Sequence, residues 1–243
     1  REGNLRMDAT STSWFNSVSS FAVSSGKWYA EFCPNSTTAM FVNIMEADQI
    51  PTVYPANQSF GYAYYYNGQK WNNGSGSSYG DSYTDGDVIG VALDMDNGNV
   101  YFYKNGVVQN SGTPAFTGLS GDFVIGVSTS GTSGEFRANF GCDPLFAGDK
   151  TSGSDNASDS NGNGLFYETP PSGYLALCAA NLSDTSISPN QDEQGSDFNQ
   201  VVFYDGNGSN THQITGVGFK PDMVHIKVRN QSASHYNIDS TRG

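Results

Sequence analysis

The sequence predicts an all-β protein built on an antiparallel β-sandwich, and three observations carry that prediction. First, two apolar runs, Val88–Met95 and Val100–Tyr103, flank Asp96-Asn97-Gly98, and Asn105-Gly106 follows before Val107-Val108. Asn-Gly between such runs favours a tight hairpin turn, because only Gly and Asn adopt its positive φ angles at low cost. Second, the 243 residues include 14 Tyr and 15 Phe, which suit strands better than helices. Third, strand-like runs recur every ~8–15 residues without helical periodicity.

The remaining strands of this first region follow from local alternation. Lys27–Cys33 alternates apolar with mostly polar residues, which predicts a half-buried strand with the Glu31 carboxylate facing solvent. In the 88–95 strand, we expect Ile89, Val91, Leu93 and Met95 to share one face, while Gly90 and Ala92 leave the other face thin enough for close packing. Asn67–Tyr83 is polar and rich in Gly and Ser, and is expected to be a long loop. Four further strands are expected at Ala39–Met45, Ser59–Tyr66, Phe123–Thr129 and Glu135–Phe140.

A second region begins after a change in composition. We divide the chain into a sandwich at 1–147, a Gly/Ser/Asp-rich linker or loop at 148–164, and a second, incomplete β-rich region at 165–243. In the second region, Leu175–Leu182 is expected to be a short helix. Strands are expected at Val201–Tyr204, Ile214–Phe219 and Asp222–Val228. Because the sequence starts at Arg1 and stops soon after this last strand, we interpret it as an ordered piece of a longer polypeptide or a processed product.

Composition excludes several classes of function. The net charge is −13 and the 11 basic residues are scattered, which argues against binding a nucleic-acid backbone. No apolar run approaches the ~20 residues of a membrane helix, so membrane insertion is not expected. The cysteines Cys33, Cys142 and Cys178 lack the spacing of a zinc or redox motif, and we expect no disulfide and small buried roles for Cys33 and Cys142.

No cofactor, metal site or catalytic residue is expected. Asp155, Asp159 and Asn161 do not follow the EF-hand calcium pattern, and no helices flank them. The strand carboxylates Glu31 and Glu135 do not form the alternating acidic pair expected of a glycosidase. The sequence lacks a nucleophile elbow and a phosphate-binding loop. His225 falls within an alternating strand, where a structural role is more common than general-base catalysis.

Aromatic residues next to amide-rich loops are the better candidates for a binding site. Aromatic rings stack on apolar sugar faces, while amides and carboxylates hydrogen-bond around them. Trp71 is also compatible with a plug at the end of the sandwich, and the same loops are compatible with contacts to neighbouring subunits. The predicted ligand-binding residues are Tyr54, Asn67, Trp71, Asn73 and Tyr79.

Four blocks of the sequence resemble the SPRY domain in order and spacing. They are GKWYAEF (26–32), FGYAYYYNGQKW (60–71), YGDSYTDGDVIGVALDMDNGNVYFYKNG (79–106) and FRANFG (136–141). The resemblance covers about Phe21–Gly141 and implies a bent sandwich of the concanavalin-like jelly-roll type that binds without catalysis. It also implies that ligand contacts come from loops, which here match Glu46–Gln58, Asn67–Tyr79 and Ser111–Gly121.

A second segment, ITGVGFKPDMVHIKVRN (214–230), is similar to a segment of virion structural proteins of tailed bacteriophages. Together the two resemblances suggest a non-enzymatic virion protein, in a tail fibre, tail or capsid decoration, exposed on the particle surface. Its expected partners are other virion subunits, including copies of itself, and a host-surface glycan or protein. Two alternatives are a glycan-degrading tailspike enzyme and an intracellular SPRY adaptor that binds peptides.

Overall fold

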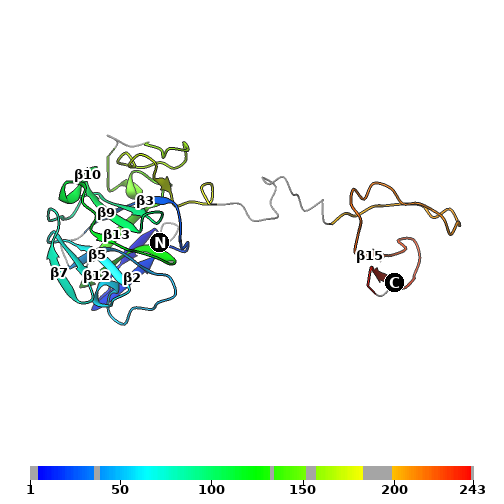
Figure 1. The fold of residues 1–243 in the computed structure, drawn as a ribbon, viewed down its shortest axis with the longest axis horizontal. Helices are drawn as coiled ribbons and strands as arrows, with labels where there is room; N and C mark the ends of the chain where they lie inside the picture. The colour runs from blue at the N-terminus through cyan, green and yellow to red at the C-terminus, as the bar shows by residue number, and fades with distance from the viewer. Residues whose placement is uncertain (1–4, 36–38, 132–133, 152–156, 183–198, 242–243) are drawn as a thin grey trace. The chain divides into compact units, whose positions relative to one another are not determined.

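Two β-sheets packed face to face form the first of two compact units of the chain, Arg1–Leu182 (Figure 1). The second unit is Ser183–Gly243. This computed structural model describes residues 5–35, 39–131, 134–151, 157–182 and 199–241. Over these ranges, no helix is long and apolar enough to span a membrane. The first unit is therefore an all-β antiparallel sandwich, as the sequence predicts.

Sheet A contains eight strands and sheet B contains six. The path of sheet A is β1 (Arg6–Asp8), β13 (Glu135–Asn139), β3 (Lys27–Pro34), β8 (Ile89–Asp94), β9 (Asn99–Lys104) and β10 (Val107–Val108). Beside this path, β11 (Phe116–Thr117) pairs with β9, and β14 (Leu175–Ala176) pairs in parallel with β3. Sheet B has the order β2 (Ser11–Val18), β12 (Phe123–Gly131), β4 (Met40–Glu46), β5 (Gly61–Tyr65), β6 (Gln69–Asn72) and β7 (Ser75–Ser78). Three 3₁₀ turns connect strands: η1 (Pro55–Asn57), η2 (Gln109–Gly112) and η3 (Phe146–Gly148).

The main core lies between the two sheets, and the predicted meander is confirmed as β8, β9 and β10. The apolar face of β8 enters this core with Ile89, Val91 and Leu93 fully buried. On the opposite face, an added Cβ at Gly90 would lie 2.6 Å from the Tyr29 hydroxyl oxygen. The close packing expected at this glycine is therefore present. The four other strands predicted for this region correspond to β4, β5, β12 and β13 within two residues at each end.

Three local predictions for the first unit were wrong. Residues 67–83 are not all loop, because Asn73-Gly74 forms a turn with φ angles of 50° and 70° that joins β6 to β7. The strands β1 and β2 were not predicted, although both pair with neighbours in the sheets. Leu175–Leu182 is not a helix: Leu175 and Ala176 pair with Trp28 and Tyr29 instead. In this last case, pairing with the sheet overrides the helix propensity of an Ala- and Leu-rich segment.

The outer face of sheet A is covered, which corrects the prediction of a half-buried β3. Seven of the eight β3 residues are buried, and the Glu31 side chain has no exposed surface. Residues 157–182, called the covering segment below, supply Phe166, Tyr174 and Ala176 to a second core cluster with Tyr29. The covering segment belongs to the first compact unit, so the structure divides the chain at 182/183 rather than at 148–164. Cys33 is buried as expected, whereas Cys142 is exposed.

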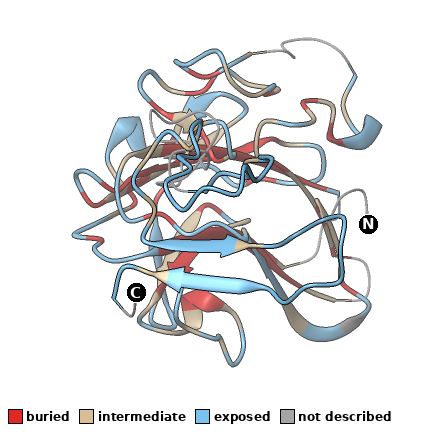
Figure 2. Cartoon of the chain, turned by 90° about the vertical axis from the view of Figure 1, so that its right-hand side faces the viewer, coloured by how far each residue is buried: buried red, intermediate tan, exposed pale blue. Residues whose placement is uncertain are grey.

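The second unit contains one two-stranded sheet among its described residues, with β15 (Met223–Ile226) antiparallel to β16 (Tyr236–Asp239). The strand predicted at Asp222–Val228 is confirmed as β15, whereas β16 was not predicted. Val201–Tyr204 and Ile214–Phe219 are not strands, because neither run has a hydrogen-bonded strand neighbour in the described part of the unit. Both strands of the hairpin are mostly exposed (Figure 2).

Candidate functional site

Five aromatic rings gather on the outer face of sheet B, opposite the main core. Phe41 of β4 is at the centre: its ring centroid lies 4.3 Å from Tyr65, 4.8 Å from Tyr54 and 6.0 Å from Trp71. Trp14 of β2 completes the group, with its centroid 4.4 Å from that of Tyr54. Phe41 is buried and the other four rings are half-buried. We call these five residues the aromatic surface.

Strand alternation and register explain why these rings share one face. Phe41 pairs directly with Tyr65 across β4 and β5, and Ala63 pairs with Trp71 across β5 and β6. Residues two apart on a strand point to the same side, so Ala63 and Tyr65 place Trp71 and Phe41 on the same face. The small side chain of Ala63 leaves room for the larger rings around it.

The loop that follows β4 folds back over this face and fixes Tyr54. The Asn16 Nδ2 donates a 2.7 Å hydrogen bond to the Val53 carbonyl oxygen. Pro55 is buried against Gly61, where an added Cβ would lie 2.1 Å from the Pro55 carbonyl oxygen. The absence of a side chain at Gly61 is therefore required for the loop to approach the sheet. This contact holds the ring of Tyr54 against Trp14 and Phe41.

Amide side chains border the aromatic surface. The Trp71 Nε1 and the Asn67 Nδ2 both donate to Gln69 Oε1, at 3.2 and 3.0 Å. The backbone N–H of Gln69 donates in turn to Asn67 Oδ1 at 3.1 Å. Asn67 is exposed, so one end of this chain of hydrogen bonds faces solvent. The arrangement combines an apolar stacking face with an adjacent polar edge.

The aromatic surface is electrically neutral. Burial raises the pKa of Tyr65 to about 12, and burial also raises the pKa of Tyr54. Both hydroxyl groups therefore stay protonated at neutral pH and retain an O–H donor. The five rings of the aromatic surface therefore carry no charge themselves, although the whole chain carries a net charge of −13.

The structure brings three of the five predicted ligand-binding residues together. Tyr54 and Trp71 belong to the aromatic surface, and Asn67 is connected to Trp71 through Gln69. Asn73 lies in the β6–β7 turn, where its backbone N–H donates to the Gln58 carbonyl oxygen. Tyr79 is different: it is 6% exposed and packs in the core between the sheets, so we leave it out of the site.

Four members of this region are not among the predicted binding residues: Trp14, Phe41, Tyr65 and Gln69. Trp14 was missed because β2 was not predicted, although Trp14 and Asn16 have the spacing of a single strand face. The loop Ser111–Gly121 was expected to contribute ligand contacts, but none of its residues belongs to the aromatic surface. Ala115 packs in the main core and accepts a hydrogen bond from Lys70, which lies on the opposite face of β6 from Trp71.

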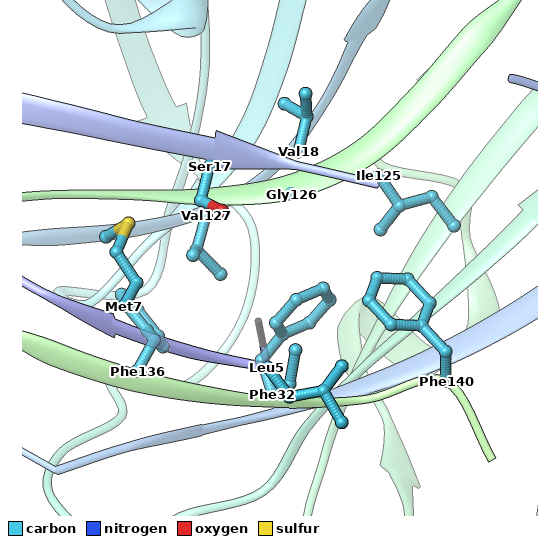
Figure 3. A pocket seen from close by; sticks show the side chains of 11 residues that line it. Leu5, Met7, Ser17, Val18, Phe32, Ile125, Gly126, Val127, Phe136 and Phe140 are labelled. Atoms are coloured by element: carbon cyan, nitrogen blue, oxygen red, sulfur yellow. The ribbon is translucent and has the colours of Figure 1, made fainter. Parts of the chain in front are cut away.

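Two hollows in the first unit differ in size and position. A cavity of about 40 Å³ lies between the sheets, where Phe32, Ile125 and Phe140 point toward one space (Figure 3). Ligand pockets usually span roughly 300–1,000 Å³, so this cavity is too small to hold a ligand. A wider, open depression of about 370 Å³ lies beside Asn67 and has Met40 and Tyr83 in its wall. It reaches the usual size of a ligand pocket, but Met40 and Tyr83 belong to the main core and not to the aromatic surface.

The two strand carboxylates Glu31 and Glu135 are both engaged in contacts within the sandwich. Glu31 has no exposed surface, which prevents contact with a substrate. Glu135 forms ion pairs with Arg6 and Arg137, at 2.9 and 3.1 Å. Over the same ranges, no group of three or more His, Cys, Asp and Glu side chains is arranged to hold a metal ion. Asp159 accepts four hydrogen bonds from nearby N–H groups, while Asp155 lies outside the described residues.

The fold and the site define a β-sandwich with a partly exposed aromatic surface on one sheet. Comparison with known families agrees with that class: residues 32–144 match the SPRY domain model, and SPRY domains mediate protein–protein interactions. Residues 194–243 match a second model, Domain of unknown function (DUF7483). Among solved structures, the crystal structure of the SPRY domain of human HERC1 is similar. It is 20% identical, covers 55% of this chain and 87% of its own, and has a TM-score of 0.47.

Proposed function

We propose that this chain is a non-enzymatic binding protein of a bacteriophage particle, in a tail fibre, tail or capsid decoration. In this proposal, the aromatic surface of the SPRY-like sandwich contacts another virion subunit or a molecule on the host surface. The observation that carries the proposal is the grouping of four half-buried rings around Phe41 on one face of sheet B. Half-buried rings on a rigid sheet lose little conformational freedom on binding, which favours their use in recognition.

Two features of the sequence support the setting on a particle. Segment 214–230 is similar to virion structural proteins, and it follows a SPRY-like sandwich in the same chain. Charged residues form only 14% of the chain, so solubility depends on Ser, Thr, Asn and Gly, as suits an extracellular particle surface. Mass spectrometry of purified particles tests the setting directly. The chain is expected in stoichiometric amounts, and its absence would contradict the setting.

The role of the aromatic surface is tested with Trp71→Ala and Tyr54→Ala in the purified chain. Binding is measured against immobilised virion proteins, host envelope extracts and an array of neutral and acidic glycans. Each substitution is expected to weaken binding about tenfold or more, because it removes a central aromatic contact. Tyr103→Ala is the matched control, since Tyr103 is a partly buried ring on the outer face of sheet A. Unchanged binding by both test variants would show that the aromatic surface is not the binding site.

An intracellular adaptor is the second candidate, and the SPRY match at residues 32–144 favours it. In that case the same surface binds an extended peptide of a cellular protein. The two candidates differ in location and ligand rather than in the residues used. Presence in purified particles supports the first candidate, whereas absence there together with Trp71-dependent capture of a peptide supports the second.

A further inference from the structure

The β15–β16 hairpin of the second unit brings two histidines together. His225 is on β15 and pairs with Asn237 of β16, while His235 immediately precedes β16. Residues two apart on a strand point to the same face, so His235 lies diagonally across from His225. This placement is independent of the aromatic surface, which belongs to the first unit.

The two imidazole rings meet through nitrogen atoms. The Nε2 of His225 lies 2.7 Å from the Nδ1 of His235, and the ring centroids are 4.9 Å apart with an interplanar angle of 32°. Both side chains are exposed. At this distance only one of the two nitrogens carries a proton, and its partner presents a lone pair. The two facing nitrogens are close enough for one metal ion to replace the shared proton between them, since imidazole nitrogen is a common zinc ligand.

We propose that His225 and His235 form a two-histidine site for a borderline divalent transition-metal ion such as Zn²⁺. A Zn–N distance of ~2.0–2.1 Å with tetrahedral geometry separates two ligand nitrogens by about 3.3 Å. The pair therefore opens from 2.7 Å by roughly 0.6 Å, a movement that exposed side chains allow. The donating ring transfers its proton from the facing nitrogen to its other nitrogen, so neither histidine changes charge. Water completes the coordination.

The surroundings favour this class of ion over Mg²⁺ or Ca²⁺. Imidazole nitrogen suits Zn²⁺, Cu²⁺ and Ni²⁺, whereas Mg²⁺ and Ca²⁺ require several oxygen ligands. Among the described residues, no metal-holding carboxylate group adjoins the two histidines. Lys227 immediately follows β15, and its Nζ donates to the carbonyl oxygens of Val228 and Gln231, at 2.6 and 3.4 Å. Its charged group is thus hydrogen-bonded within the segment that joins β15 to β16.

Metal binding would join the two strands of the hairpin through their side chains. An isolated two-stranded hairpin is marginally stable in water, and a metal that binds only the folded form stabilises it. The site would therefore make the order of β15 and β16 depend on the ion. Imidazole ligation also leaves open coordination positions through which a neighbouring molecule can contact the same ion.

The test titrates the full chain with ZnCl₂ after chelator treatment, using calorimetry and ¹⁵N spectra of the histidine side chains. One Zn²⁺ is expected to bind per chain, with shifts of the His225 Nε2 and His235 Nδ1 resonances. His225→Gln and His235→Gln are each expected to weaken binding about tenfold or more, since even loss of a supporting residue around a metal costs ~10–100-fold. MgCl₂ is expected to leave the histidine resonances unshifted.

His212→Gln is the matched control, because His212 is the remaining histidine of the chain and makes an edge-to-face contact with Tyr204, with centroids 5.9 Å apart. It is expected to bind Zn²⁺ as the unsubstituted chain does. Equal affinity in all three variants would show non-specific binding to the acidic surface and would overturn the proposal. Unshifted His225 and His235 resonances in the unsubstituted chain would also overturn it, independently of how the variants fold.

Discussion

The outer faces of the two sheets are built by the same alternation of side chains along each strand. The outer face of sheet A is covered by another segment of the chain, whereas that of sheet B is partly exposed. On sheet A, the covering segment buries Tyr29 and the Glu31 carboxylate. On sheet B, the loop 46–58 covers part of the face and leaves Tyr54 and Trp71 half-exposed. The alternation within a strand therefore decides which residues share a face, while segments distant in sequence decide whether that face is covered. Sheet A is stabilised on both faces, and sheet B keeps one face partly exposed.

The largest effect is expected from Glu31→Ala on the covered face. The Glu31 carboxylate accepts hydrogen bonds from the backbone N–H groups of Tyr167 and Glu168, at 2.9 and 2.8 Å, and from Asn139 Nδ2 at 3.2 Å. Alanine leaves these buried donors without their acceptor, which lowers the free energy of unfolding by about 3–5 kcal/mol. Urea unfolding at pH 7 measures the loss. Glu135→Ala is the control on a neighbouring strand, and an equally large loss there would show that Glu31 has no special role.

The covered face should also respond to pH. Burial raises the pKa of Glu31 from 4.5 to about 7, although hydrogen bonds from the Tyr167 and Glu168 N–H groups oppose the shift. Because the folded chain holds this proton more tightly than the unfolded chain, stability from this group is greatest below pH 4.5. It then falls by roughly 3 kcal/mol as the pH rises through about 7. Urea unfolding between pH 5 and 8 should show this decline in the unsubstituted chain. Glu31→Gln should remove it, and a decline of the same size in that variant would assign it to other groups.

On sheet B, Gly61→Ala tests how the loop 46–58 is held. The added Cβ would meet the backbone of Pro55 at 2.1 Å, so the loop must move away from the sheet. We expect a loss of about 2 kcal/mol in the free energy of unfolding and a larger exposure of Tyr54. Tyrosine fluorescence quenching measures that exposure. Gly206→Ala is the control, because no atom lies within 4 Å of its added Cβ and, like Gly61, Gly206 does not have a left-handed φ angle. Unchanged quenching would show that Pro55 does not fix the loop.

The sandwich was predictable because turns and alternation are local signals, whereas the covering of its faces is not local. The strands β8 and β9 follow from Asn-Gly turns and apolar runs that a reader of the sequence can see. The burial of Glu31 depends on Tyr167 and Glu168, 136 and 137 residues further along the chain. No local pattern around Glu31 distinguishes it from a solvent-facing strand carboxylate. Tyr54 and Trp71 were predicted from their loops, but their contact through Phe41 required the register of β4, β5 and β6.

The smallest effects are expected at two equivalent turns, one in each sheet. Asn73-Gly74 in sheet B and Asn105-Gly106 in sheet A both place Asn in the left-handed region, with φ angles of 50° and 48°. Asn105 also accepts a 2.8 Å hydrogen bond from the Val88 N–H and donates one of 2.8 Å to Asp87. Glycine keeps the turn and removes the side chain. Asn105→Gly should therefore cost about 1 kcal/mol in the free energy of unfolding, and Asn73→Gly only a few tenths, ~0.3 kcal/mol. Urea unfolding of the two variants side by side measures the difference, and equal losses would show that the turn conformation, rather than the Asn105 hydrogen bonds, sets the cost.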